Sequence, residues 1–167
     1  MIQKAINKNI TPNAQALLNE LSDLVGKSII TGQHTQTIAM EEIAYINQVT
    51  GKSPKLRGFE LLAYSPNINY EDASKECLTE IYENQNTIEV ALKWAMEEKG
   101  ILTFSFHWFS PIGGKDKSFY AKNTDFDASN ILLPNSEERK AFFHDMDAIV
   151  KLLLPFAEKD IPILWRP

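Results

Sequence analysis

The chain has 167 residues, of which 44% are hydrophobic and 23% are charged, and this balance excludes disordered, collagen-like and low-complexity proteins. Lys and Arg number 17 against 22 Asp and Glu, so a formal net charge of −5 argues against nucleic acid or an anionic membrane surface and favours a neutral partner. The single cysteine, Cys77, excludes an internal disulfide framework, and three scattered histidines offer no zinc-ligand spacing, so no metal is expected.

The N-terminal region predicts a helix, a strand and a second helix, with neither a signal peptide nor a membrane span before them. Thr11 followed by Pro12 is typical of a helix start, and Gly26 of a helix stop. The run 28–32 is short, β-branched and ended by glycine, which predicts a buried strand. Apolar residues at helical spacing then lead to Gly51, a residue suited to a left-handed helix cap.

The second predicted strand, residues 56–64, is nearly all apolar but contains Arg57 and Glu60. Because side chains alternate across a strand, these two charged residues lie on opposite faces, and at least one of them is structural. A mostly helical stretch follows, and its best-defined part is an amphipathic helix over 87–99 that Gly100 is expected to end.

The third predicted strand, residues 101–109, has one polar face and one aromatic face. Alternation places on one face Thr103, Ser105 and His107, and on the other Leu102, Phe104, Phe106 and Trp108. Polar residues at the carboxyl end of such a strand are candidates for binding a ligand.

After this strand, residues 110–134 form a stretch too long for a plain connection, which indicates a functional loop. Asn135 and Glu138 resemble a capping box at the start of a last helix, which Pro155 should kink or end early. A fourth strand is expected over 161–166.

Helices and strands thus alternate, which indicates parallel strands joined by right-handed crossovers. An open doubly wound sheet and part of a (β/α) barrel both fit this order. The turn after the first predicted strand, residues 32–35, has one glycine instead of a glycine-rich phosphate turn. The polar row opposite an aromatic row also favours the barrel.

Several segments, taken in order, resemble glycoside hydrolase family 26, best known as endo-β-1,4-mannanases on a TIM barrel. They are IITGQHT at 29–35, TGKSPKLRGFE at 50–60, GILTFSFHWFSP at 100–111, FYAKNTDFD at 119–127 and IPILWRP at 161–167. The resemblance covers essentially the whole chain. It implies that residues 1–167 are the N-terminal half of the catalytic barrel, truncated to about the first four strands.

The resemblance also implies that no catalytic residue lies within this chain. In the family, Trp-Arg-Pro is followed by Leu-His-Glu, whose glutamate is the acid/base, and the nucleophilic glutamate ends the seventh strand. A retaining glycosidase needs two carboxyl groups about 5–5.5 Å apart, so the chain alone should be inactive. The parent reaction would be retaining hydrolysis of β-1,4-mannosidic bonds, with no cofactor.

Five residues are candidates for substrate binding: His107, Trp108, Arg166, Asp127 and Tyr120. The resemblance places His107 in the sugar site, where a structural hydrogen bond is the alternative. Trp108 faces the helices by alternation unless the strand bulges and turns its ring to the sugar. Arg166 could orient a carboxylate or form a plain salt bridge across the barrel. Asp127 and Tyr120 could bind sugar at an outlying subsite or belong to a solvated loop.

The expected partner is β-mannan or a related neutral oligosaccharide, and the resemblance implies a secreted or cell-surface parent protein. Exposed parallel edges of a half barrel should favour homo-oligomers. The sequence leaves two other functions open. One is a non-catalytic carbohydrate-binding or interaction half barrel that self-associates, and the other is a different parallel α/β enzyme with a flat open sheet.

Overall fold

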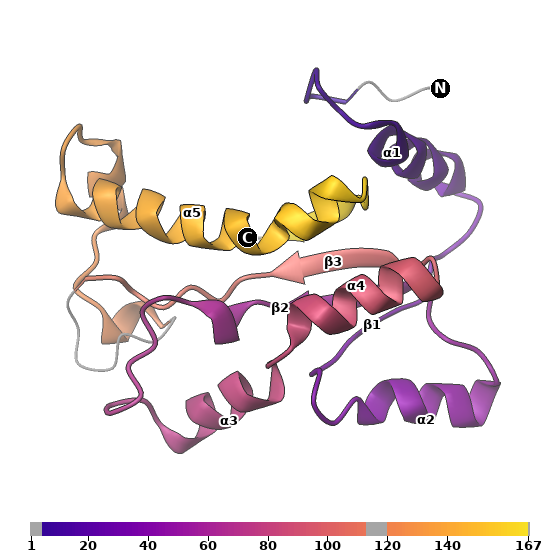
Figure 1. Ribbon diagram of the computed structural model, residues 1–167, viewed down its shortest axis with the longest axis horizontal. Helices are drawn as coiled ribbons and strands as arrows, with labels where there is room; N and C mark the ends of the chain where they lie inside the picture. Colours follow the sequence, from indigo (N-terminus) through magenta and orange to yellow (C-terminus); the bar gives the residue numbers. More distant parts are fainter. Residues whose placement is uncertain (1–4, 113–119, 167) are drawn as a thin grey trace.

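The computed structural model describes residues 5–112 and 120–166 (Figure 1). The α-helices are α1 (Pro12–Leu24), α2 (Glu41–Thr50), α3 (Lys75–Glu83), α4 (Thr87–Glu97) and α5 (Glu137–Glu158). The strands are β1 (Gly32–His34), β2 (Leu56–Glu60), β3 (Ile101–Ser105) and β4 (Ile163–Arg166). Short 3-10 helices are η1 (Leu62–Tyr64), η2 (Ala121–Asn123) and η3 (Ala128–Leu132).

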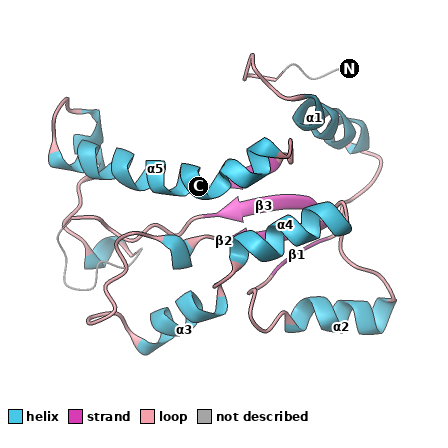
Figure 2. Ribbon diagram, viewed as in Figure 1, coloured by secondary structure: helices cyan, strands magenta, loops and turns pink. Residues whose placement is uncertain are grey.

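The four strands form one parallel sheet in the order β1-β2-β3-β4, so each strand pairs with the next strand along the chain. The carboxyl ends of β2, β3 and β4 are in register, because Ser105 pairs with Glu60 on one side and with Arg166 on the other. Helices α4 and α5 lie along the sheet (Figure 2). Sequential parallel strands with helices on one face are the arrangement of a (β/α) barrel wall.

The main core lies between the sheet and helices α4 and α5. The ring of Phe104 on β3 packs 5.7 Å from the ring of Phe59 on β2 and 5.4 Å from that of Phe156 on α5. All three phenylalanines, and Leu102, are fully buried. The alternation predicted for β3 is confirmed, since its aromatic face supplies this core and its polar face points away from it.

The first strand lies later in the chain than predicted. The apolar run 28–31 is not a strand, and Ile29 is 93% exposed, whereas the strand occupies Gly32–His34. Pairing of Gly32 with Leu56 sets this position, because long-range register with β2 outweighs the β propensity of the preceding run.

Strands β2 and β3 end earlier than predicted, at Glu60 and Ser105. Residues 62–64 form η1 instead, because Glu60 accepts hydrogen bonds from the backbone of the two residues that follow it. His107 and Trp108 consequently lie just beyond β3.

The last helix differs from prediction at both ends. Its N-cap is Ser136, whose hydroxyl accepts a hydrogen bond from the Arg139 amide, so Asn135 and Glu138 do not form a capping box. Pro155 does not end the helix, which continues to Glu158. Fully buried Phe156 anchors this last turn in the core and offsets the hydrogen bond that proline cannot donate.

Gly100 does not end α4, whose last residue is Glu97. A Cβ at position 100 would lie 2.0 Å from Nε1 of Trp94. The glycine therefore leaves room for the buried Trp94 ring at the start of β3. Trp165 on β4 is 43% exposed.

Within the described part of the chain, none of the helices is both long and apolar enough to cross a membrane. Over residues 5–112 and 120–166, no group of three or more His, Cys, Asp or Glu side chains is arranged to hold a metal ion.

Candidate functional site

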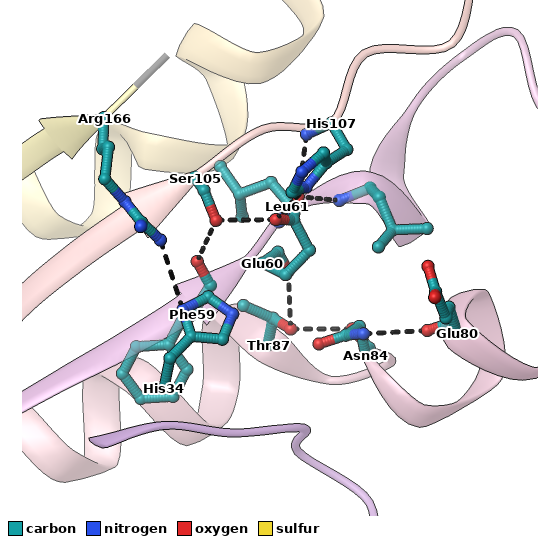
Figure 3. A network of polar contacts seen from close by, with 11 residues as sticks. His34, Phe59, Glu60, Leu61, Glu80, Asn84, Thr87, Ser105, His107 and Arg166 are labelled. Atoms are coloured by element: carbon teal, nitrogen blue, oxygen red, sulfur yellow. Dashed lines mark hydrogen bonds and ion pairs between the residues drawn. The ribbon is translucent and has the colours of Figure 1, made fainter. Parts of the chain in front are cut away.

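Polar side chains gather at the carboxyl end of the sheet, on the face away from the core (Figure 3). Glu60 ends β2, Ser105 ends β3, and His107 lies two residues further along. Because positions 105 and 107 have the same parity, both side chains reach the Glu60 carboxylate of the neighbouring strand.

The Glu60 carboxylate accepts five hydrogen bonds. Its Oε1 accepts from the backbone amides of Leu61 at 2.9 Å, Leu62 at 3.0 Å and His107 at 2.9 Å. Its Oε2 accepts from the Ser105 hydroxyl at 2.6 Å and lies 2.7 Å from Nδ1 of His107. Glu60 is only 3% exposed, so these five donors replace the water that it would otherwise bind. The carboxylate thereby fixes the ends of two strands together.

Burial and hydrogen bonding act in opposite directions on the pKa of Glu60. Burial raises this pKa, but the hydrogen bonds from Ser105 and from the backbone and ring of His107 outweigh burial and hold it below the ordinary value of 4.5. Glu60 is therefore ionised at neutral pH. With its lone pairs occupied and no proton to give, it is suited to positioning its neighbours rather than to acid catalysis.

The Glu60 carboxylate also sets the orientation of the His107 ring. Nδ1 carries the proton because it faces a carboxylate oxygen, which makes Nε2 the acceptor nitrogen of the neutral ring. The side chain of His107 is 56% exposed. It combines a fixed ring with access to solvent, as a residue that binds a sugar hydroxyl would.

Two edge strands meet across this same face. Nη2 of Arg166 on β4 lies 3.4 Å from Nδ1 of His34 on β1, although β2 and β3 separate these strands (Figure 3). In a flat sheet three strand spacings of about 4.8 Å would hold the backbones of these two strands roughly 14 Å apart. The contact brings the side chains of both edges together over this face, which inward curvature of the sheet favours.

Gly58 makes room for the contact between the edges. A Cβ at this position of β2 would lie 2.5 Å from Nδ1 of His34. Partial burial, and next the charge of Arg166, lower the pKa of His34 below 6.5. His34 is thus neutral at neutral pH and accepts a hydrogen bond from the guanidinium.

Trp108 faces the helices, as strand alternation predicts. Its Nε1 donates a hydrogen bond of 2.7 Å to Oδ2 of Asp145, a fully buried carboxylate on α5. The indole ring packs edge-on against Phe126 at 5.0 Å and Phe142 at 5.7 Å. Asn67 also donates to Asp145, so this carboxylate joins the loops after β2 and β3 to α5.

The two loop candidates occupy the segment after β3. Asp127 is the N-cap of η3, and its Oδ1 accepts hydrogen bonds from the amide of Ser129 at 2.9 Å and from its hydroxyl at 2.7 Å. Tyr120 is 56% exposed and lies 5.7 Å from Nζ of Lys122. Neither residue joins the hydrogen-bonded network around Glu60.

A cavity of about 170 Å³ opens on the network at the ends of β1, β2 and β3. Its lining residues are His34, Gln36, Glu60, Leu62, Glu80, Asn84 and His107. Two of them, Glu60 and Glu80, are carboxylates, and the imidazole and amide side chains add neutral donors and acceptors, a combination that suits the hydroxyl groups of a carbohydrate.

The model of glycosyl hydrolase family 26 matches residues 6–167 of this sequence. The chain belongs to glycosyl hydrolase family 26. The match includes every element described above, from α1 to β4. The half-barrel fold predicted from the sequence is therefore confirmed.

Curated family 26 relatives are several times longer than this chain. A mannan endo-1,4-beta-mannosidase of Thermothelomyces thermophilus is 31% identical over 169 residues, which are 96% of this chain and 32% of that protein. Mannan endo-1,4-beta-mannosidase A of Piromyces sp is 28% identical and shares 97% of this chain and 26% of its own length. The chain thus spans about a third or less of these relatives.

Solved structures agree with the family assignment. A ruminal GH26 endo-beta-1,4-mannanase superposes with a TM-score of 0.81 at 24% identity, over 98% of this chain and 34% of its own. The GH26-CBM35 beta-(1,4)-mannanase of Podospora anserina gives a TM-score of 0.74 at 28% identity, over 96% of this chain and 35% of its own.

The sequence identified some members of the site and missed others. Parity placed His107 on the polar face, and the structure brings it to Glu60. Glu60 itself was noted only as opposite in parity to Arg57. A charged residue embedded in an apolar strand was the available signal, but the strand end at Glu60 and its pairing with Ser105 became visible only in the structure.

Proposed function

We propose that residues 1–167 are the N-terminal half of a family 26 catalytic barrel whose parent activity is retaining hydrolysis of β-1,4-mannosidic bonds in mannan. The observation that carries the proposal is the Glu60–Ser105–His107 network at the carboxyl end of the sheet, the end where barrel enzymes bind substrate. The names of the relatives support mannan as the polymer.

In this proposal each residue of the network has a separate part. His107 hydrogen-bonds a sugar hydroxyl through Nε2, and Glu60 holds the ring in that tautomer. His34 and Arg166 line the same curved face from the two edge strands. Trp108, Tyr120 and Asp127 remain candidates for outer contacts, although the hydrogen bond from Trp108 to Asp145 points its indole toward α5.

The proposal also concerns location and completeness. Mannan is a polymer too large to pass a membrane, so we infer that the parent enzyme works outside the cell or on its surface. The chain alone binds sugar weakly and does not cleave it, because the carboxylates lining the cavity are Glu60, which is fully hydrogen-bonded, and Glu80.

A second candidate, a self-associating carbohydrate-binding half barrel, is favoured by apolar residues exposed near both edges of the sheet. Before β1 and on α2 these are Ile29 at 93%, Tyr45 at 67% and Val49 at 63%; on α5 and β4 they are Val150 at 56% and Trp165 at 43%. Light scattering on the purified chain separates the candidates, since a discrete dimer supports self-association and a monomer supports a half barrel that another polypeptide completes.

Sugar binding at the network is tested by titrating mannohexaose into the chain and following backbone amide signals by NMR. We expect saturable shifts around His107, and His107→Ala should weaken binding about tenfold, the usual effect of losing one or two hydrogen bonds. His144, whose side chain is 75% exposed on α5, supplies the matched control as His144→Ala and should bind as the unaltered chain does. Chemical-shift changes that are the same in His107→Ala as in the unaltered chain would refute sugar binding at His107.

A further inference from the structure

Two N–H-bearing atoms of a buried arginine on the outer face of β2 have no acceptor among the residues that the structure describes. Arg57 is 3% exposed, and its Nε and Nη2 atoms are buried without a hydrogen-bond partner in the structure. Burying an ionised group without a partner is costly, and a guanidinium cannot avoid this cost by losing its proton. The described part of the chain therefore supplies no acceptor for these two atoms of Arg57.

Two aromatic rings lie beside this guanidinium. Its Cζ atom lies 4.7 Å from the centre of the Phe59 ring and 5.6 Å from that of Trp94. Cation–π contacts of this kind stabilise the charge, but they leave the N–H groups at the edge of the guanidinium without an acceptor. An acceptor must approach that edge in the plane of the guanidinium.

A cavity of about 260 Å³ lies beside Arg57, between α4 and the start of α2. Met40, Val90 and Trp94 form apolar walls. Because positions 57 and 60 differ in parity, this cavity lies on the opposite face of β2 from Glu60.

The charged residues at the mouth of the cavity restrict what can enter. Lys93 pairs with Glu97 at 3.9 Å, and Glu98 is exposed beside them. The two positive charges of Arg57 and Lys93 equal the two negative charges of Glu97 and Glu98, so the cavity has no surplus positive charge for a dianion such as phosphate. A monoanion needs only the one charge of Arg57. A carboxylate matches the planar edge of a guanidinium with two parallel hydrogen bonds.

We propose that this cavity binds a small monocarboxylate with a short apolar tail, its carboxylate on the edge of Arg57 and its tail against Met40 and Val90. The site is assigned from the unpartnered N–H groups, the stacked rings and the cavity beside them. It goes beyond the proposed function, because it requires no sugar and no mannan hydrolysis.

The test is an NMR titration of the ¹⁵N-labelled chain with sodium butyrate, observed at the Arg57 Nε–H and Trp94 Nε1–H signals. We expect a saturable shift of both signals with a Kd in the millimolar range, and none with 1-butanol, which has a similar tail but no charge. Arg57→Met should raise the Kd by about tenfold or more, the effect of losing a charge-assisted hydrogen bond.

Two further variants keep the test decisive. Arg139→Met is the matched control, because Arg139 also stacks on a ring, Phe143 at 4.9 Å, but has an acceptor in the Ile131 carbonyl. It should bind butyrate unchanged. If Arg57→Met fails to fold, Val90→Trp replaces it in the test. This variant fills the cavity while Arg57 is still present, and it should abolish butyrate binding. Equal shifts with butyrate and butanol, or no shift with butyrate, would overturn the proposal and leave water as the acceptor.

Discussion

Locust-bean gum incubated with the 167-residue chain will release no reducing sugar above a heat-treated control. A retaining glycosidase needs two carboxyl groups about 5–5.5 Å apart, one to protonate the leaving oxygen and one to attack the anomeric carbon. The cavity at the carboxyl end of the sheet has two lining carboxylates, Glu60 and Glu80. Reducing-end assays on the gum and on mannohexaose measure the outcome directly.

Neither carboxylate is equipped for this chemistry. Glu60 is ionised at neutral pH, so it has no proton to donate to the leaving oxygen. Both of its oxygens accept hydrogen bonds, five in all, so neither is available to attack the anomeric carbon. Glu80 is exposed on α3, without a second available carboxylate to complete a pair in this cavity. The mannan endo-1,4-beta-mannosidase of Thermothelomyces thermophilus is a suitable positive control. Turnover by the chain that disappears in Glu80→Gln would contradict this account and assign catalysis to Glu80.

Replacing Glu60 by alanine will lower the free energy of unfolding by about 3–5 kcal/mol, the usual cost of removing one member of a buried, charged hydrogen-bonded group. The substitution removes the Glu60 acceptor from the amides of Leu62 and His107, whereas the Leu61 amide keeps the Ser105 carbonyl at 2.9 Å. Urea unfolding followed by tryptophan fluorescence measures the loss. Glu60→Gln keeps the shape and one acceptor oxygen, so it should cost less, about 1–2 kcal/mol.

The contribution of Glu60 to stability should also depend on pH in a defined direction. Because the folded pKa lies below the ordinary value of 4.5, the stabilisation is fully present above that value and is lost as pH falls through the folded pKa. Glu60→Gln should remove this part of the acid destabilisation. Glu80→Ala is the matched control and should change the free energy of unfolding by less than about 0.5 kcal/mol. Equal losses for Glu60→Ala and Glu80→Ala would refute the structural role of the network.

Local sequence signals predicted the elements whose ends depend on near neighbours. Thr11 and Pro12 start α1 as expected, since a cap needs only residues within the next turn. The predicted position of β1 was wrong because the strand is placed by pairing with Leu56, which lies more than twenty residues further along the sequence. The predicted helix end at Pro155 was wrong for a similar reason. The last turn is held by Phe156, which packs against Phe104 on β3, far away in sequence.

The site shows the same division between local and long-range information. Strand parity placed His107 and Ser105 together, a property of one segment. The orientation of Trp108 remained open in the sequence, because Asp145, its hydrogen-bond partner, lies 37 residues away on α5. The contact between His34 and Arg166 joins residues 132 positions apart, a pairing that no local pattern specifies.

That contact is tested most directly by the pKa of His34, measured by NMR in the unaltered chain and in Arg166→Met. Burial and the nearby guanidinium lower this pKa below 6.5, and the second cause exists only if the edge strands β1 and β4 face each other. The half barrel predicts that Arg166→Met raises the pKa of His34, while Arg139→Met on α5 leaves it unchanged. A His34 pKa that does not respond to Arg166→Met would contradict the contact between the two edge strands on which this account of the half barrel rests.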